Sequence, residues 1–377
     1  MTSHIAFVLL IIATAGAAYL AIACLRLAAF ARRPLEFASE FLPSMTILKP
    51  IAGLEPDIYE NLRSCCDQDY EEFHEVILCL HSSDDPALAI AQRIAAEFPS
   101  IVRIAIGENP DIANPKIANL AKPGAQAQGE IVVIADSDIR VGRDYLRALA
   151  AAFATESAGA ATCLYRGMPN ASLASRLGAQ QIEEVFIPSV LVALALGPLG
   201  FCLGATMAVR RSLLDRIGGL AALGAGLADD HRLGQLVTAA KKTIELSRYV
   251  VQTTVPETTL RALWSHELRW ARTNFTLAPA GYAFSFLMYA LPLALVYLAA
   301  SRNVVLGFPL LAVVIALRVT LHYLARAALR VTRRDDVALI PIRDVLSLAV
   351  WFASLFGRTV RWRGRIYSTG HPSTGSG

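Results

Sequence analysis

Long apolar stretches lie near both ends of the chain. Residues 5–25 contain no charged side chain, and two further apolar runs at residues 281–300 and 304–324 are joined by the short link 301–303. A helix of about 20 apolar residues is long enough to span the hydrocarbon core of a bilayer. The pattern therefore predicts an N-terminal membrane helix and a C-terminal membrane hairpin.

Arginines follow both regions: Arg26, Arg32 and Arg33 after the first run, and Arg326, Arg330, Arg333 and Arg334 after the hairpin. Because positive residues concentrate on the cytoplasmic side of membrane helices, the first run is predicted to be a signal anchor with its N-terminus outside. Everything after Arg33 then begins in the cytoplasm, and the hairpin returns there. A cleaved signal peptide would carry basic residues ahead of a shorter apolar core.

Two other apolar segments leave their relation to the membrane open. Residues 172–203 start as an amphipathic stretch and continue without charge from residue 185. Residues 345–356 are apolar but short for a span, and arginines follow them at 358–365. We expect the first segment to be membrane-associated, and residues 281–357 to form a C-terminal membrane region whose last part is re-entrant, interfacial or spanning.

Short apolar strands alternate with helical stretches in the middle of the chain. Strands are predicted at residues 45–48, 76–80, 101–106 and 131–135, and helices at residues 57–66, 86–98 and 144–153. Such an order is typical of a parallel sheet covered by helices on both faces. The predicted fold class is α/β, with a cytoplasmic catalytic domain over residues 43–275 that binds ligands at the carboxyl ends of its strands.

Composition agrees with a membrane-bound protein and argues against a nucleic-acid partner. Apolar residues make up 55% and charged residues 18% of the 377 positions, with a net charge of +4. No block of Lys and Arg interleaves with aromatic residues, as a nucleic-acid footprint would. The six cysteines form no CxxC pair, so we expect buried thiols in a reducing compartment.

Two carboxylates follow the last predicted strand directly. Asp136 and Asp138 stand two positions apart, with Ser137 between them. A pair of this kind can hold a divalent ion, Mg²⁺ or Mn²⁺, that also binds a diphosphate, because hard ions prefer oxygen ligands and complete their shell with substrate phosphates. The alternative is a turn or a helix cap.

Two further acidic pairs occur at predicted element ends. Asp84 and Asp85 follow strand 76–80, where a carboxylate can accept hydrogen bonds from a base or ribose, or Asp85 can cap the next helix. Asp229 and Asp230 precede another helix. Asp230 is either a second cap or a general base that takes a proton from an acceptor hydroxyl.

A basic and aromatic cluster precedes the hairpin on a predicted helix. His266, Arg269 and Trp270 belong to it. Arg269 can neutralise a leaving diphosphate, and Trp270 can stack on a sugar or an acceptor. The alternative is an anchor of Trp and Arg at the membrane interface.

The order of these residues constrains the topology. Asp136 and Asp230 flank the apolar run at residues 185–203. A single crossing by this run would put the two carboxylates on opposite sides of the membrane. A shared active site therefore requires the run to be re-entrant or interfacial, which is tolerated where protein or a cavity borders the backbone.

Six short motifs in the same order resemble the ceramide glucosyltransferase family and its bacterial relatives, which are membrane-bound inverting enzymes with a GT-A fold. The matching stretches are Thr46-Ile47-Leu48-Lys49-Pro50, Asp84-Asp85-Pro86-Ala87, Asn114-Pro115-Lys116-Ile117-Ala118-Asn119-Leu120, Asp136-Ser137-Asp138-Ile139-Arg140, Ala228-Asp229-Asp230 and Arg269-Trp270. The resemblance covers residues 43–365. It implies a UDP-sugar donor, a membrane lipid as acceptor, and a multi-pass protein of the bacterial inner membrane whose catalytic domain faces the cytoplasm.

The resemblance also implies roles for single residues. Asp85 would contact the uridine, Asp136 with Asp138 would hold the metal and diphosphate, and Asp230 would be the base. Pro50, Lys116 and Asp229 would belong to the donor site. The family's (Q/R)xxRW pattern matches at Arg269 and Trp270, whereas its first position is His266 here.

The stretch from His266 to Trp270, with residues 163–167 upstream, is more similar to bacterial glycosyltransferases of hopanoid synthesis. That resemblance implies transfer of N-acetylglucosamine to bacteriohopanetetrol, and the alternative is transfer of glucose to ceramide. A processive polysaccharide synthase would need more membrane helices. A lipid transporter would not need paired acids, and a module that only binds nucleotide sugars would not need Asp230. The small polar tail 368–377 is predicted to be disordered.

Overall fold

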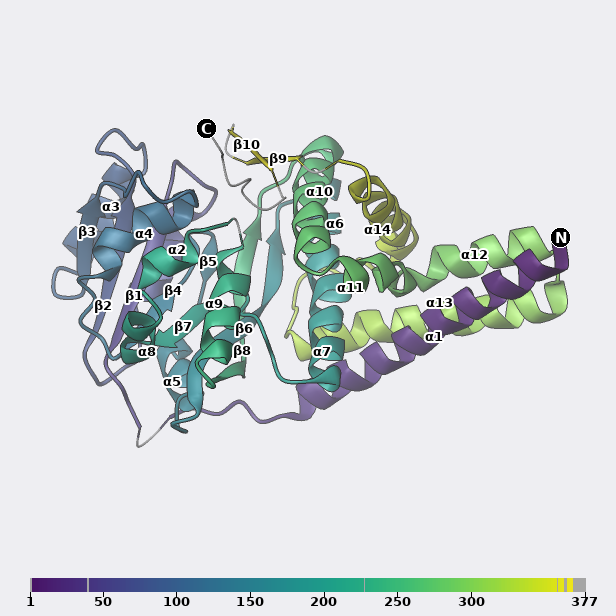
Figure 1. Cartoon of the computed structure of the whole chain (residues 1–377), viewed down its shortest axis with the longest axis horizontal. Helices are drawn as coiled ribbons and strands as arrows, with labels where there is room; N and C mark the ends of the chain where they lie inside the picture. Colours follow the sequence, from purple (N-terminus) through teal and green to yellow (C-terminus); the bar gives the residue numbers. More distant parts are fainter. Residues whose placement is uncertain (1, 39–40, 227, 358, 363–364, 369–377) are drawn as a thin grey trace, which may run out of the picture. The chain divides into compact units, whose positions relative to one another are not determined.

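The computed structural model describes residues 2–38, 41–226, 228–357, 359–362 and 365–368, and the chain divides into two compact units. The sheet unit comprises Arg33–Met168 and Ala193–Pro256. The helical unit comprises Met1–Arg32, Pro169–Val192 and Glu257–Gly377. Figure 1 labels the elements of both units. Residues 369–377 of the tail predicted to be disordered lie outside the described residues.

The described part of the sheet unit contains an eight-stranded sheet with the order β3-β2-β1-β4-β7-β6-β8-β5. Its strands are β1 (Met45–Ile51), β2 (His74–Leu80), β3 (Val102–Ile106), β4 (Ile131–Ile134), β5 (Ile139–Arg140), β6 (Ala158–Pro169), β7 (Met207–Arg210) and β8 (Thr243–Val255). Strands β1 to β4 pair in parallel. The α/β class and the four predicted parallel strands are therefore confirmed.

The other half of the sheet contains antiparallel strands that the sequence analysis did not predict. Strand β7 pairs antiparallel with both β4 and β6, and β8 pairs antiparallel with β5. The first half of β6 is built from Ala, Gly and Thr, and β7 is only four residues long. Neither has the run of branched apolar residues by which a buried strand is recognised.

Helices cover both faces of the parallel half. Helices α2 (Ile58–Cys66), α3 (Leu88–Glu97) and α5 (Tyr145–Ala151) share one core with Met45, Ile47 and Ile51 of β1. The intervening Leu48 points to the opposite face, where it lies against Gly124 of α4 (Pro115–Gly124). Alternate residues of β1 thus pack on different helices, as the period of a strand requires.

Three short helices complete the sheet unit: α8 (Arg211–Arg216), η2 (Leu220–Leu223) and α9 (Asp229–Ala239). The chain enters this unit for the second time within α7 (Ile187–Leu196), and returns to the helical unit after β8.

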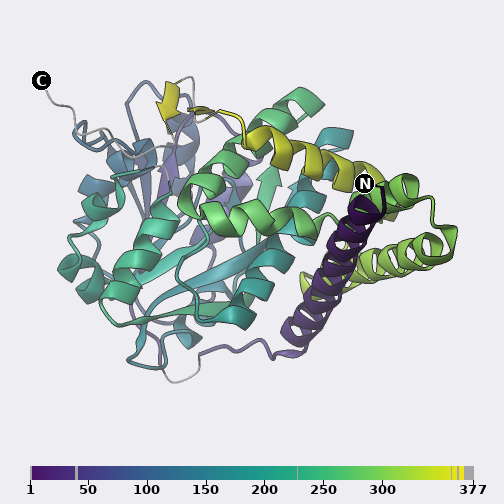
Figure 2. The same ribbon diagram turned by 45° about the vertical axis from the view of Figure 1, so that its right-hand side comes forward.

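The long helices of the helical unit are α1 (Thr2–Arg32), α12 (Ala290–Ser301) and α13 (Val304–Ala328), which lie side by side in both views (Figures 1 and 2). Helices α12 and α13 form a hairpin. Arg302 ends α12 in the left-handed region, with φ 52°. Asn303 caps α13 by accepting a hydrogen bond from the backbone N–H of Leu306.

The run at residues 281–300, expected as one membrane helix, is broken in the structure. Helix α11 (Pro279–Phe284) and the 3₁₀ turn η3 (Ser285–Met288) make an angle of 68° with α12. Pro292 stands in the first turn of α12. Since proline has no N–H and its ring clashes with the preceding turn, a continuous helix through this position is disfavoured.

The remaining helices are α6 (Leu173–Gln181), the π-helical turn η1 (Ile182–Phe186), α7, α10 (Leu260–Leu277), η4 (Val337–Leu339) and α14 (Ile340–Ser354). Strands β9 (Thr359–Trp362) and β10 (Arg365–Ser368) form an antiparallel pair. Among the described residues, His4–Arg32, Leu173–Leu196, Val304–Ala328 and Val337–Ser354 are long and apolar enough to cross a membrane, and the bent pair Pro279–Met288 with Ala290–Ser301 makes a fifth if it is one span. The chain therefore has the helices of a membrane protein.

Charged side chains inside these apolar helices are paired. Arg318 of α13, 2% exposed, donates to Asp344 of α14 and to Glu184 of η1. His322, one turn further along α13, bonds Glu184 and Asp335. Because an unpaired charge is costly in such surroundings, the pairs tie α13, α14 and η1 together.

Candidate active site

The carboxylate pair predicted at the end of β4 lies on a loop that a buried lysine supports. The Nζ atom of Lys49, a residue of β1 that is 0% exposed, donates to the carbonyl oxygens of Asp136 at 2.5 Å and Ile139 at 3.2 Å. The ammonium thus holds the loop from both sides of Asp138. Its positive charge lies under the two carboxylates.

Asp138 is the buried member of the pair. Its Oδ2 atom accepts a hydrogen bond of 2.7 Å from the hydroxyl of Thr253 in β8. Burial raises the pKa of Asp138 to about 6, and the charges of Asp136 and Glu55 add to the effect. Glu55 itself accepts a hydrogen bond from Ser137. A cluster of like charges of this kind favours a bound cation.

Lys116 connects two of the acidic pairs. It stands in the first turn of α4, which Asn114 caps by accepting from the backbone N–H of Lys116. The Nζ atom lies 2.7 Å from Oδ1 of Asp136 and 3.0 Å from Oδ2 of Asp229. Burial disfavours the ammonium, but the two carboxylates raise the pKa of Lys116 above its ordinary value. The lysine is therefore a fixed positive charge between them.

Asp230, the predicted base, is adjacent to this bridge. Its Oδ1 atom accepts a 2.7 Å hydrogen bond from the backbone N–H of His231 in the first turn of α9. Burial raises the pKa of Asp230 to about 6, and the neighbouring charge of Asp229 adds to the shift. A carboxylate with this pKa is ionised at neutral pH and is a stronger base than an exposed aspartate.

Gly204 lies between the base and the carboxylate pair. A Cβ atom at this position would lie 3.5 Å from Oδ2 of Asp230 and 3.8 Å from Oδ2 of Asp136. Asp136 and Asp230, which flank residues 185–203 in the sequence, thus both lie near Gly204 in the fold. Because residue 204 has no side chain, no atom of its own stands between the two carboxylates at this position.

Asp85 occupies the loop after β2, at the carboxyl ends of the parallel strands. Both oxygens of its carboxylate accept from the backbone N–H of Gly53, at 3.0 and 3.1 Å, and Oδ1 accepts from the N–H of Ala87 at 2.9 Å. Gly53 has φ +76°, a conformation that favours glycine. Helix α3 begins at Leu88 with Ala87 at the N-cap position, so the expectation that Asp85 is that cap is wrong.

Pro50 lies within β1, opposite Cys79 of β2. Its neighbours at the ends of these strands are held by Asn119 of α4, whose side chain donates to the carbonyls of Ile51 and Cys79. All seven predicted residues of the donor site and the base therefore belong to the sheet unit: Pro50 lies near the end of β1, Asp85, Asp136 and Asp138 lie on the loops after β2 and β4, and Lys116, Asp229 and Asp230 lie at the starts of α4 and α9.

His266, Arg269 and Trp270 lie on α10 in the helical unit. The Nδ1 atom of His266 bonds the carboxylate of Glu257, and its ring lies edge-on to Trp270 with 4.5 Å between centroids. Burial opposes ionisation of Glu257, but His266 and Arg269 lower its pKa below the ordinary value. The three predicted residues thus form one cluster around an ionised glutamate.

Comparison with known proteins decides the family. The sequence profile of glycosyl transferase family 21 matches residues 8–373, nearly the whole chain. The chain belongs to this family. Membership confirms the predicted enzyme class, a glycosyltransferase.

The relatives include ceramide glucosyltransferases. That of Komagataella phaffii is 39% identical over 102 residues, which are 26% of this chain and 20% of the relative. Ceramide glucosyltransferase 1 of Caenorhabditis elegans is 24% identical over 248 residues, 63% of this chain and 51% of the relative. The chain thus spans about a fifth to about a half of the length of these two proteins.

A solved mannosyltransferase, PcManGT from Pyrobaculum calidifontis in complex with GDP-Man and Mn²⁺, has a similar fold. It is 19% identical, the match covers 94% of this chain and 99% of that protein, and the TM-score is 0.55. At this identity the likeness shows the fold alone. The family 21 chain therefore has a GT-A-like glycosyltransferase fold.

The donor atoms near Asp136 fit a hard divalent ion. No three His, Cys, Asp or Glu side chains among the described residues form a metal cluster. The carboxylates of Asp136 and Asp138 supply only hard oxygen ligands, and the position beside Gly204 is open. A protein that provides two carboxylates leaves the remaining ligand positions to phosphate oxygens and water, as Mg²⁺ sites commonly do.

Four residues of the site were absent from the predicted site residues: Lys49, Glu55, Thr253 and Gly204. Lys49 stands in a motif that matches the family, and a lysine inside an otherwise apolar strand was a usable signal. Glu55 and Thr253 reach Ser137 and Asp138 from distant segments, which nothing in the sequence indicates.

Proposed function

We propose that the protein is an inverting glycosyltransferase that moves a sugar from a UDP-sugar to a hydroxyl of a membrane lipid at the cytoplasmic face. The observation that carries this proposal is the pairing of Asp230 and Asp136 around the open position beside Gly204. One carboxylate has the pKa of a base, and the other belongs to a pair suited to a metal and diphosphate. Membership of glycosyl transferase family 21 agrees with it.

Asp230 acts as the base. Its carboxylate takes the proton of the acceptor hydroxyl while the hydroxyl oxygen forms a bond to the anomeric carbon of the sugar. The bond from that carbon to the diphosphate oxygen breaks, and its electron pair leaves with UDP. A single displacement of this kind inverts the anomeric configuration, through an oxocarbenium-like state.

The donor is held by the loops at the ends of the parallel strands. Asp85, fixed by the N–H groups of Gly53 and Ala87, accepts hydrogen bonds from the uridine. Asp136 and Asp138 would hold a divalent ion, Mg²⁺ or Mn²⁺, which would supply positive charge to offset that of the diphosphate. Lys116 keeps the carboxylates of Asp136 and Asp229 apart and orients them.

The cluster on α10 serves the leaving group and the acceptor. Arg269 contributes a cation for the diphosphate, and Trp270 contributes an aromatic face for the acceptor. His266 holds Trp270 edge-on and is itself held by Glu257. These roles follow the family pattern, from which only the position of His266 departs.

The acceptor is proposed to be a hopanoid such as bacteriohopanetetrol, with N-acetylglucosamine as the sugar. The sequence from His266 to Trp270 favours it. Ceramide with glucose is the second candidate, which the two ceramide glucosyltransferase relatives favour. In both, a lipid hydroxyl reaches Asp230 from the bilayer side.

Products from a mixed lipid pool test the proposal. Purified full-length protein with Mn²⁺ receives either UDP-glucose or UDP-N-acetylglucosamine, together with bacteriohopanetetrol and ceramide, and mass spectrometry identifies the glycolipids. One lipid should gain one sugar with release of one UDP. Release of UDP without a glycolipid, or addition of many sugars, would contradict single transfer to lipid.

A further inference from the structure

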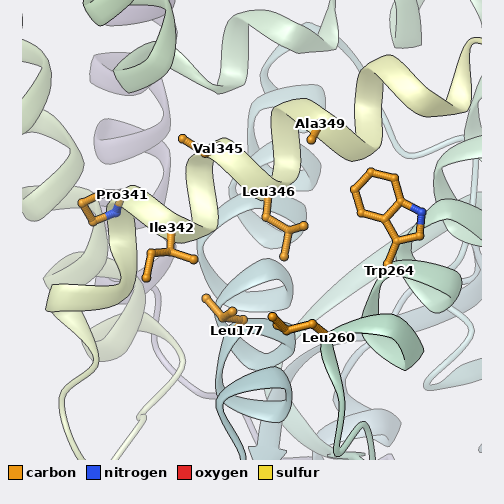
Figure 3. Close-up of a pocket in the computed structure, with 8 residues that line it drawn as sticks. All are labelled: Leu177, Leu260, Trp264, Pro341, Ile342, Val345, Leu346 and Ala349. Atoms are coloured by element: carbon orange, nitrogen blue, oxygen red, sulfur yellow. The ribbon is translucent and has the colours of Figure 1, made fainter.

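Large apolar side chains are exposed in both units of the chain. In the helical unit, Ile342 and Val345 of α14 line an apolar pocket (Figure 3) and belong to the candidate membrane span Val337–Ser354. In the sheet unit, Leu196 is 87% exposed, more than any other large apolar side chain among the described residues. A single exposed leucine is ordinary, so its surroundings decide what it means.

Leu196 stands in a short apolar stretch, residues 195–200, called the 195–200 segment here. Its sequence is Ala-Leu-Gly-Pro-Leu-Gly, and five of the six residues are exposed. Leu199, 4% exposed, anchors the segment in the protein. A Cβ atom added at Gly197 or Gly200 would meet no atom within 4 Å, so both glycines border open space. The segment is therefore a contiguous apolar surface.

The 195–200 segment continues a helix of membrane type. Leu173–Leu196 is long and apolar enough to cross a membrane, and Leu196 is its last residue. The helix ends there because Pro198 disfavours the helical conformation of Gly197 before it. The stretch without charged side chains does not end with the helix but runs from residue 185 to residue 209. This continuity makes a lipid surface, rather than water, the surroundings that the exposed leucine matches.

The end of the segment touches the helix that carries the proposed base. Asp230 and Gly234 stand four residues apart on α9, so they lie on the same face of it. A Cβ atom added at Gly234 would lie 2.3 Å from the Cα atom of Phe201 and 2.4 Å from the carbonyl oxygen of Gly200. The backbone N–H of Cys202 donates to the carbonyl oxygen of Asp230 at 3.2 Å. The chain thus runs from the apolar surface along α9 to the base.

The length of this connection limits how far Leu196 can be from the base. Gly200, which touches α9, is four residues from Leu196, and four residues of extended chain span at most about 14 Å. The polar region on each side of a bilayer is about 5–8 Å thick. With Leu196 in hydrocarbon, the start of α9 would therefore lie within the headgroup region or just beyond it.

We propose that the 195–200 segment inserts into the bilayer and holds Asp230 at the boundary between lipid headgroups and water. The inference rests on the proposed function, in which Asp230 takes a proton from a lipid hydroxyl. The partner of the segment is the lipid surface itself, not one lipid species. A base held at this depth reaches hydroxyls that lie at the boundary, so the segment selects acceptors by the depth of their hydroxyl group.

Fluorescence quenching tests insertion without turnover. Leu196→Cys, in the full-length protein in phosphatidylcholine nanodiscs, is labelled with the environment-sensitive fluorophore NBD, and Ser212→Cys, at an exposed position of α8, is the matched control. The native cysteines are all buried. Because the segment lies in lipid, NBD at residue 196 should emit at shorter wavelength than at residue 212. A nitroxide near the headgroup end of the phosphatidylcholine acyl chain should quench it at least about twofold more.

Emission at residue 196 that resembles the water-exposed control, with equal quenching by the nitroxide lipid, would overturn the proposal. Emission at short wavelength without quenching by the nitroxide lipid would also overturn it, because the segment would then be covered by protein, such as a second copy of the chain.

A polar variant tests the role in transfer. Leu196→Asn removes the apolar side chain, and Phe73→Asn, at a 44% exposed position of the sheet unit directly before β2, is the matched control. The acceptor is ceramide or bacteriohopanetetrol in nanodiscs, or a short-chain analogue of the same lipid dissolved in water. Leu196→Asn should raise the KM for the nanodisc acceptor at least about tenfold, the effect of losing the burial of one leucine in lipid. The KM for UDP-sugar and kcat/KM for the dissolved acceptor should not change.

The comparison of the two acceptors separates membrane contact from a merely structural role. Equal loss of transfer to both would place Leu196 in the folding of the site and overturn the proposal, as would an unchanged KM for the nanodisc acceptor. Failure of the proposed function has a different signature: the wild-type protein then transfers sugar to neither acceptor, whereas the quenching result does not depend on transfer.

Discussion

Charge balance among single residues explains why Asp230 can act as a base. Lys116 contacts Asp136 and Asp229 but is not bonded to Asp230. The nearest fixed hydrogen bond to the Asp230 carboxylate is the backbone N–H of His231. The ammonium of Lys116 therefore pairs with Asp136 and Asp229. The pKa of Asp230 stays raised, which suits proton transfer.

Asp230→Asn removes the base while keeping the shape of the side chain, which can still accept from the N–H of His231. We expect kcat to fall by about 10²- to 10⁴-fold, the usual contribution of a general base, while the Kd for UDP-sugar changes little. Calorimetric titration with UDP-sugar and a UDP-release assay measure the two quantities. Asp215→Asn, at an exposed acid of α8, is the control. Equal loss of binding and transfer would refute the base assignment.

The pKa of Asp230 also predicts the pH dependence of transfer. Burial shifts its pKa upward, to about 6, so the neutral acid predominates below this pH and the active carboxylate above it. kcat/KM should therefore fall about tenfold for each pH unit below 6 and be flat between pH 7 and 8. A pH profile at saturating metal checks this. A fall in kcat/KM that begins only near pH 4, where exposed aspartates titrate, would contradict this prediction.

Gly204→Ala tests the open position between the carboxylates. The added methyl would lie 3.5 Å from Asp230 and 3.8 Å from Asp136, which the fold tolerates because both are ordinary contacts. It occupies space that the reacting groups need, so kcat/KM should fall by about 10²-fold, as displacements of the order of 1 Å do. Thermal unfolding should be unchanged. Full activity in this variant would show that the position is not used.

The predictable part of the site consists of residues that carry their chemistry in short motifs. Asp136, Asp138 and Asp230 are such residues, because an acid directly after an apolar strand or at a helix start is visible in the sequence. Thr253 and Gly204 are not visible in this way. Their importance comes from a hydrogen bond across the sheet to Asp138 and from the lack of a side chain between two carboxylates.

At the scale of elements, buried ion pairs connect several helices of the helical unit. The π-helical turn η1 presents Glu183 and Glu184 to cations of α13 and of the loop after it: Arg333 bonds Glu183, and Arg318 and His322 bond Glu184. A π-helical turn adds one residue to a helical turn and so changes the facing of the side chains that follow. Both glutamates are buried as a result.

The pair of Arg343 and Glu267 should dominate the stability of the contact between α10 and α14. Arg343→Met leaves Glu267 buried without a partner, which costs about 3–5 kcal/mol, and Arg343→Met with Glu267→Leu should recover part of the loss. Arg63→Met breaks an exposed pair with Glu97 and should cost much less, because water and salt screen exposed pairs. Thermal unfolding in detergent ranks the variants. Similar Tm shifts for Arg343→Met and Arg63→Met would contradict the argument.

Elements were predictable where their residues repeat with one clear period. Strands β1 to β4 are runs of branched apolar residues and were found. Strand β6 was missed because small residues fill its first half, and β7 because it is only four residues long. The break before α12 depends on one proline in a run that is otherwise apolar throughout. Hydropathy alone averages over such a residue, so the angle of 68° follows from backbone chemistry rather than from composition.

At the scale of the whole molecule, the apolar helix Leu173–Leu196 separates two of the proposed catalytic residues in the sequence. The chain leaves the sheet unit after Met168, forms the apolar helix Leu173–Leu196, and comes back to the sheet unit at Ala193. Asp136 precedes the segment Pro169–Val192 in the sequence and Asp230 follows it. Lys116 nevertheless bonds both Asp136 and Asp229, the residue next to Asp230. The residues directly before and directly after the segment Pro169–Val192 must then lie on one side of the bilayer.

Labelling of single cysteines in intact and permeabilised cells tests that topology. Ser157→Cys precedes the segment Pro169–Val192 and Ser212→Cys follows it, and both positions are exposed. An impermeant maleimide should label both only after permeabilisation, and His4→Cys, ahead of the signal anchor, should be labelled in intact cells. The native cysteines are all buried, which keeps the background low. If Ser157→Cys and Ser212→Cys reacted from opposite sides, Leu173–Leu196 would be a single crossing, and a common site for Asp136 and Asp230 would be impossible.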